Sequence, residues 1–116
     1  GKRWGRIGDS PVIGAGTYAD NRSCAVSATG HGEYFIRHTV ARDICARMQF
    51  SAATLGEAAR TVVMEELVRA DGEGGVIAVD PSGSVALVFN TPGMYRASID
   101  AAGRKVVGIY GESETP

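Results

Sequence analysis

The strongest constraint on the fold is a pair of apolar, β-branched segments joined by a short turn. The segments are residues 76–79 (VIAV) and 85–89 (VALVF), and the turn between them contains Pro81 and Gly83. Two such runs on either side of a Pro-Gly turn predict an antiparallel hairpin. Both runs are nearly continuous rather than alternating, which is typical of strands that are buried on both faces. We therefore expect helices over one face of the sheet, and another chain or further residues over the other.

Two helices are predicted between residue 33 and this hairpin. The first covers about 33–48, because its apolar residues recur at spacings of three and four. These residues are Ile36, Val40, Ala41, Ile44, Cys45 and Met48. The second begins at Thr54, which with Glu57 three residues later has the form of a capping box. Further strands are predicted at 24–28, 95–99 and 106–110, so residues 1–116 are interpreted as a single α+β domain in which helices and sheet form layers.

Charge and motif spacing exclude several classes of protein. Twelve basic and thirteen acidic residues give a net charge of −1, whereas a nucleic-acid-binding domain usually carries a basic excess. No apolar run approaches the roughly 20 residues that span a membrane. His31 and His38 are seven residues apart, without cysteines or carboxylates at ligand spacing, so no metal site is expected. Residues 14–19 match a dinucleotide fingerprint, but Pro11 lies where its strand should be, so no cofactor is expected either.

The two cysteines, Cys24 and Cys45, are too few to form a disulfide framework. Cys45 lies on the apolar stripe of the first predicted helix. The sequence therefore favours a reduced, buried thiol and a reducing compartment, which points to the cytoplasm.

A loop near the start of the chain places Arg6 and Asp9 three residues apart, with Gly8 between them. One interpretation is a local ion pair on the surface, worth about 0–1 kcal/mol. The other is a clamp for a zwitterion: a guanidinium binds a carboxylate through two hydrogen bonds, and the aspartate accepts from an ammonium group. The spacing leaves both interpretations open.

A second candidate loop, residues 29–33 (TGHGE), lies between a predicted strand and a predicted helix. Glycines at such a junction let a ligand approach the backbone N–H groups. A hydroxyl beside those groups, here that of Thr29, is what an oxyanion hole requires. The alternative is an ordinary turn from strand to helix.

Four segments together resemble one known family. Residues 5–11 (GRIGDSP), 14–21 (GAGTYADN), 28–33 (ATGHGE) and 89–96 (FNTPGMYR) follow one another in this order over nearly the whole chain. They resemble the β subunit of the plant-type asparaginases, also called isoaspartyl peptidases. The resemblance implies an N-terminal-nucleophile hydrolase with an αββα sandwich. It further implies that the precursor cleaves itself into an α and a β subunit, which pair and form a dimer of αβ heterodimers.

The resemblance also implies roles for individual residues. Arg6 would bind the α-carboxylate of asparagine or of a β-aspartyl dipeptide, and Asp9 its α-ammonium. The hydroxyl of Thr29 and the N–H of Gly30 would form the oxyanion hole, and an N-terminal Thr would be the nucleophile. The rest of the substrate-binding set would be Ile7, Gly8, His31 and Gly32.

One feature departs from the family, because the chain begins at Gly1 and not at Thr. The resemblance implies that the nucleophile and a strand or two precede Gly1, so the 116 residues by themselves should be inactive. Two alternatives remain: a glycosylasparaginase-type amidase, which shares the 5–11 segment, and a catalytically inactive fragment that only pairs with another subunit. Segments 33–37 and 90–96 and the reduced thiol favour the asparaginase over the glycosylasparaginase.

Overall fold

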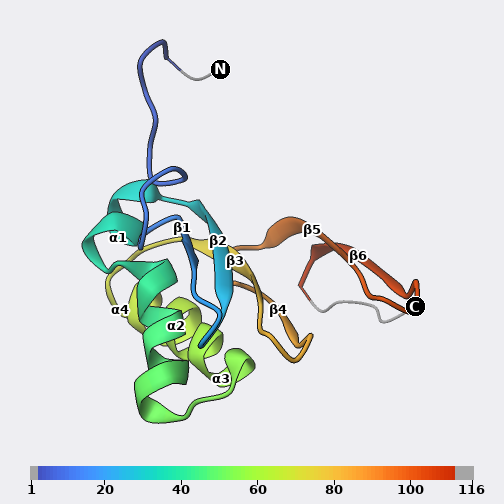
Figure 1. Ribbon diagram of the computed structural model, residues 1–116. Helices are drawn as coiled ribbons and strands as arrows, with labels where there is room; N and C mark the ends of the chain where they lie inside the picture. Colours follow the sequence, from blue (N-terminus) through green and yellow to red (C-terminus); the bar gives the residue numbers. More distant parts are fainter. Residues whose placement is uncertain (1–2, 112–116) are drawn as a thin grey trace.

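The predicted hairpin forms one side of a four-stranded antiparallel sheet in the computed structural model, which describes residues 3–111 (Figure 1). Strands β3 (Gly74–Val79) and β4 (Val85–Phe89) pair so that Val76 lies opposite Val88. The order across the sheet is β1-β2-β3-β4, with β1 at Thr17–Ala19 and β2 at Ala25–Gly30. The short β1 was not among the strands predicted from the sequence.

The two faces of this sheet differ in burial. The inward face carries small and β-branched side chains that are buried beneath the helices: Val26, Ala28, Val76, Ala78 and Ala86. On the outward face, Ile77, Val79 and Val85 are each almost half exposed. The described helices therefore cover one face, as predicted, and the covering of the other face stays a prediction.

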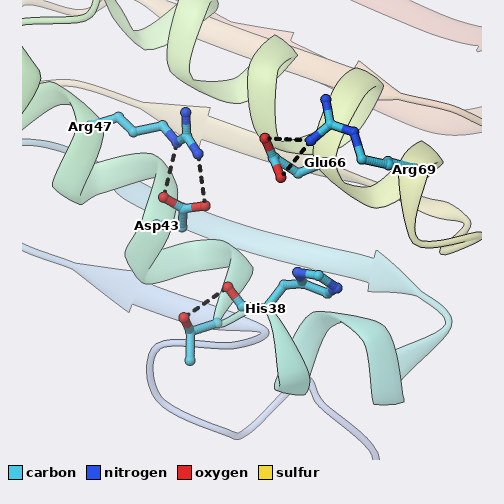
Figure 2. A network of polar contacts seen from close by, with 6 residues as sticks. His38, Asp43, Arg47, Glu66 and Arg69 are labelled. Carbon is cyan, nitrogen blue, oxygen red and sulfur yellow. Dashed lines mark hydrogen bonds and ion pairs between the residues drawn. The ribbon is translucent and has the colours of Figure 1, made fainter.

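The helix predicted at 33–48 is two helices, α1 (Gly32–Arg37) and α2 (Val40–Ser51). The single-helix prediction is wrong because Thr39 adopts a left-handed conformation with a φ of 45°. Its hydroxyl donates to the carbonyl of His38, at the junction of the two helices (Figure 2). The first turn of α2 then bonds to a distant segment, since the N–H groups of Ala41 and Arg42 donate to carbonyls at residues 15 and 14.

The second predicted helix begins where its capping box predicted. Glu57 N–H donates to the Thr54 hydroxyl at 3.2 Å, and Thr54 N–H donates to the Glu57 carboxylate at 3.0 Å. The helix continues as α3 (Leu55–Arg60), the π-helix η1 (Thr61–Glu66) and α4 (Leu67–Arg69). Its buried stripe packs against the sheet and consists of Leu55, Ala58, Ala59, Val62, Val63 and Leu67.

Ion pairs on the helices join near neighbours in sequence. Asp43 and Arg47 lie 2.9 Å apart along α2, and Glu66 and Arg69 lie 3.3 Å apart farther along the chain (Figure 2). Such partly exposed pairs contribute about 0–1 kcal/mol each. The stability of the helical layer therefore comes mainly from its buried apolar side chains.

The two cysteines correct the sequence-based interpretation, because the structure joins Cys24 and Cys45 in a disulfide. Both residues are buried, Cys24 just before β2 and Cys45 on α2, and their Cα atoms are 5.4 Å apart. The prediction failed because packing of α2 on the sheet brings together two cysteines that are 21 positions apart in sequence. The prediction of a reducing compartment therefore loses its premise.

The last two predicted strands form a separate antiparallel hairpin, β5 (Gly93–Ile99) and β6 (Lys105–Tyr110), which extends away from the helices (Figure 1). Arg96 is buried within it and donates to the carbonyls of Met94 and Tyr110. The architecture is thus mixed helix and sheet with antiparallel pairing, as the α+β prediction required. Within the described residues, no helix has the length and apolarity needed to cross a membrane.

Candidate active site

One cavity is lined by both loops that the sequence singled out, which the resemblance places around the same substrate. It has a volume of about 230 Å³ and is lined by residues from positions 6–10 and from the end of β2. The lining residues are Arg6, Ile7, Gly8, Asp9, Ser10, Thr29 and Gly30. Residues that carry a guanidinium, a carboxylate and a hydroxyl group therefore line a space large enough for an amino acid.

Asp9 is the buried polar residue of this cavity, with only 6% of its surface exposed. Its Oδ2 atom has no hydrogen-bond partner in the described part of the chain. The ion pairs found between residues 3 and 111 involve neither Asp9 nor Arg6, which is exposed. The structure therefore does not support the surface-pair interpretation. A buried carboxylate oxygen without a partner is costly unless something binds it.

Gly32, in the first turn of α1, leaves room for the Asp9 carboxylate. A Cβ atom at position 32 would lie 2.7 Å from Asp9 Oδ1 and 3.2 Å from Asp9 Cγ, which is closer than ordinary van der Waals contact. The absence of a side chain at Gly32 is what allows the carboxylate to occupy this position.

The Gly-rich segment 14–16 holds the Asp9 loop in place. A Cβ atom at Gly16 would collide with the backbone of Asp9 and Ser10. The Gly16 carbonyl accepts from the N–H of Ala28 in β2 at 2.9 Å, which ties the segment to the sheet. The carbonyls at 14 and 15 also accept from the start of α2. The segment that matched a dinucleotide fingerprint thus connects a loop, a strand and a helix.

The second loop, Thr29 to His31, is held against the start of β3. Gly30 has a φ of 138°, and a Cβ there would collide with the backbone of Glu73 and Gly74. His31 N–H donates to the Glu73 carbonyl at 2.8 Å. Only glycine fits at position 30, so that the backbone rather than a side chain borders the cavity.

Other residues of the predicted site take different positions. Ile7 is 75% exposed and forms an apolar part of the cavity wall, and Gly8 turns the loop with a φ of 69°. His31 is exposed and lies at the N-cap of α1, outside the residues that line the cavity. Ser10 lines the cavity although the sequence assigned it no role. Its place in the Arg6–Asp9 loop was the only available signal.

The strongest pKa shift in the described chain lies in a turn outside this cavity. Side-chain and backbone hydrogen bonds from Arg22 lower the pKa of Asp20 to about 2. Hydrogen bonds within turns likewise lower the pKa of Asp80, chiefly from Ser82, and of Asp100, chiefly from Arg104. These shifts reflect turn geometry.

No group of three or more potential metal-ligating side chains occurs among residues 3–111.

Comparison with known proteins gives consistent matches over most of the chain. The family model described as asparaginase matches residues 1–109. The isoaspartyl peptidase of Escherichia coli is 55% identical over 108 residues, covering 93% of this chain and 34% of that protein. A putative isoaspartyl peptidase/L-asparaginase of Dictyostelium discoideum is 51% identical over 84% of the chain and 28% of its own length. A probable isoaspartyl peptidase/L-asparaginase of Arabidopsis thaliana is 46% identical over 94% and 33%. The chain thus spans about a third of the length of these relatives.

Proposed function

Because this chain belongs to the asparaginase family, we propose that the whole protein hydrolyses the side-chain amide of L-asparagine and the isopeptide bond of β-aspartyl dipeptides. The observation that carries the proposal is the buried Asp9 carboxylate, whose Oδ2 atom has no hydrogen-bond partner among residues 3–111, in the cavity that Arg6 and Thr29 also line. The names of the relatives, isoaspartyl peptidase and isoaspartyl peptidase/L-asparaginase, support the same substrate classes.

The proposed binding mode grips the aspartyl end of the substrate at two points. Arg6 binds the α-carboxylate through its guanidinium, and Asp9 accepts a hydrogen bond from the α-ammonium. These are charge-assisted hydrogen bonds, each worth about 1.5–3 kcal/mol. The two contacts together would select an α-amino acid and leave its side-chain carbonyl free to point toward Thr29 and Gly30.

In the proposed reaction, the hydroxyl of an N-terminal threonine attacks that carbonyl, and the threonine's own α-amine accepts the proton. The Thr29 hydroxyl and the Gly30 N–H stabilise the negative charge on the oxygen of the tetrahedral intermediate. The C–N bond then breaks, ammonia or an amino acid leaves with the proton, and an aspartyl ester remains. Water hydrolyses the ester and releases aspartate. This nucleophile is proposed from family membership and lies outside the 116 residues.

We propose that an α subunit from the same precursor completes an αββα sandwich with this chain, and that two αβ pairs assemble. The outward sheet face supports this, because Ile77, Val79 and Val85 there are apolar and almost half exposed. Covering such side chains stabilises an assembly by about 25 cal/mol per Å² of apolar surface removed from water.

The test compares substrates on the full-length protein. We expect release of aspartate from β-aspartyl-leucine and from asparagine, and little release from a glycosylated asparagine. Arg6→Ala should raise KM by about 10- to 150-fold, because it removes a charge-assisted contact. Thr29→Ala should lower kcat by roughly 10²–10³-fold, as for loss of an oxyanion donor.

Other outcomes identify the alternatives. Preferred cleavage of the glycosylated asparagine would establish the glycosylasparaginase-type activity. The disulfide removes the earlier reduced-thiol argument against that activity, so the substrate comparison is decisive. Absence of hydrolysis by the full-length protein at millimolar substrate would establish an inactive subunit.

A further inference from the structure

Asn90 follows β4 directly, and its side chain forms hydrogen bonds with three residues from two other parts of the chain. Its Nδ2 atom donates to the carbonyls of Val63 in η1 and of Gly72, each at 2.9 Å. Its Oδ1 atom accepts from the N–H of Gly74 at 2.9 Å. Both amide protons and one carbonyl lone pair are therefore used, close to the full capacity of this side chain.

These bonds converge on residues 72–74, the turn that leads from α4 into β3. The main chain of Asn90 adds another bond, since its N–H donates to the Gly74 carbonyl at 3.0 Å. The side chain thus holds the turn at both ends, through Gly72 and Gly74, and ties it to the helical layer through Val63.

The same turn is the support of the candidate oxyanion loop. His31 N–H donates to the Glu73 carbonyl, and Gly30 pairs with Gly74 in the sheet. A Cβ on Gly74 would lie 2.9 Å from the Gly30 Cα and would collide with the Thr29 carbonyl. The backbone of the 72–74 turn is in direct contact with the backbone at Gly30, so a displacement of the turn must displace Gly30.

We propose that Asn90 is a positioning residue for hydrolysis, whose carboxamide holds the 72–74 turn where it sets the position of Thr29 and Gly30 in the cavity. This inference rests on the proposed function, because it assigns those two residues to the oxyanion hole. Asn90 is absent from the residues that line the cavity, so it acts through the loop and not on the substrate.

The test uses two substitutions in the full-length protein. Asn90→Asp keeps the shape but replaces two donors with a charged acceptor that faces the carbonyls of Val63 and Gly72. Asn90→Ala removes all the side-chain bonds and serves as the second variant. The matched control is Thr54→Ala. It removes the capping box of α3, which like the Asn90 contacts consists of hydrogen bonds between side chains and backbone, but it does not touch the 72–74 turn.

The kinetic readout is the separation of kcat from KM on β-aspartyl-leucine, measured well below the unfolding midpoint of each variant. A misplacement of an oxyanion donor by about 1 Å can cost on the order of 100-fold in rate. We expect both Asn90 variants to lower kcat by roughly 10- to 100-fold with KM changed less than about threefold, because Arg6 and Asp9 lie on another loop. Thr54→Ala should leave both constants near wild type.

A second readout does not depend on activity. Hydrogen exchange at the His31 amide should accelerate at least about tenfold in the Asn90 variants, and remain unchanged in Thr54→Ala. If kcat and His31 exchange in the Asn90 variants match those of Thr54→Ala, the inference is overturned. If the wild-type protein itself is inactive, the proposed function fails, but the exchange measurement still tests the role of Asn90. Unchanged exchange at His31 in the Asn90 variants would then refute the anchoring by Asn90, and faster exchange would support it.

Discussion

Replacing Gly32 with alanine separates the proposed ammonium contact from general stability. Position 32 is the first residue of α1 and has no positive φ, so its backbone accepts an alanine. The new Cβ would lie 2.7 Å from Asp9 Oδ1, whereas ordinary contact begins at 3.4 Å. The carboxylate must therefore move by about 0.7 Å, the difference between these two distances.

The expected cost appears in substrate binding. Misdirecting a charge-assisted hydrogen bond forfeits up to about 1.5–3 kcal/mol, which corresponds to a rise in KM of about 10- to 150-fold. The assay is steady-state hydrolysis of β-aspartyl-leucine by the full-length protein, with thermal unfolding measured in parallel. Because alanine is the better helix former by up to about 1 kcal/mol, the unfolding midpoint should fall little.

The matched control is Gly56→Ala, in the first turn of α3. A Cβ there meets nothing within 4 Å, so the substitution should raise stability slightly and leave KM unchanged. A double variant tests the route of the effect: when Asp9 is already alanine, Gly32→Ala should add nothing to KM. A Gly32→Ala enzyme with wild-type KM, or an equal loss in both glycine variants, would refute the role assigned to Asp9.

Three other predictions concern stability and ionisation. Leu67→Ala should lower the free energy of unfolding by about 2–5 kcal/mol in denaturant titrations, because Leu67 is fully buried, while exposed Val68→Ala should change it by less than about 0.5 kcal/mol. Reducing the disulfide, or removing it with Cys45→Ala, should cost about 3 kcal/mol and lower the unfolding midpoint; a midpoint insensitive to reductant in wild type would contradict this. The pKa of Asp20 is lowered from 3.8 to about 2, chiefly by the side-chain hydrogen bond from Arg22, so its contribution to stability is present above about pH 4 and is lost as the pH falls toward 2. NMR titration of Asp20 should show this pKa, and Arg22→Ala should return it toward 3.8.

Local patterns accounted for the elements whose stabilising contacts are close in sequence. The capping box at Thr54 and Glu57 specified where α3 begins, and the turn at Pro81 and Gly83 specified the hairpin of β3 and β4. The same holds for the loops of the candidate site. Gly8 and Gly30 have positive φ angles there, which glycine adopts readily, so the residue type itself indicates the turn. What these patterns could not show was which loops face one another.

The parts that the sequence missed depend on contacts between distant segments. The chain breaks between α1 and α2 at Thr39, and the first turn of α2 donates its N–H groups to the carbonyls of residues 14 and 15 instead of continuing α1. The bond between Cys24 and Cys45 forms because the helix packs on the sheet, and nothing in the spacing of two cysteines reveals that packing. The anchoring by Asn90 likewise joins residues 16 to 27 positions apart.

The sequence by itself determined the classes of element, the apolar stripe of each helix and the chemical groups available for binding, since these depend on residue type and short-range spacing. Only the tertiary structure decided that Arg6, Asp9 and Thr29 line one cavity, and that Asp9 is buried there without a partner for Oδ2 in the described chain. The physical reason is that a site is made by the packing of distant backbone segments. Gly16, Gly30 and Gly32 permit that packing by leaving room for the chains to approach.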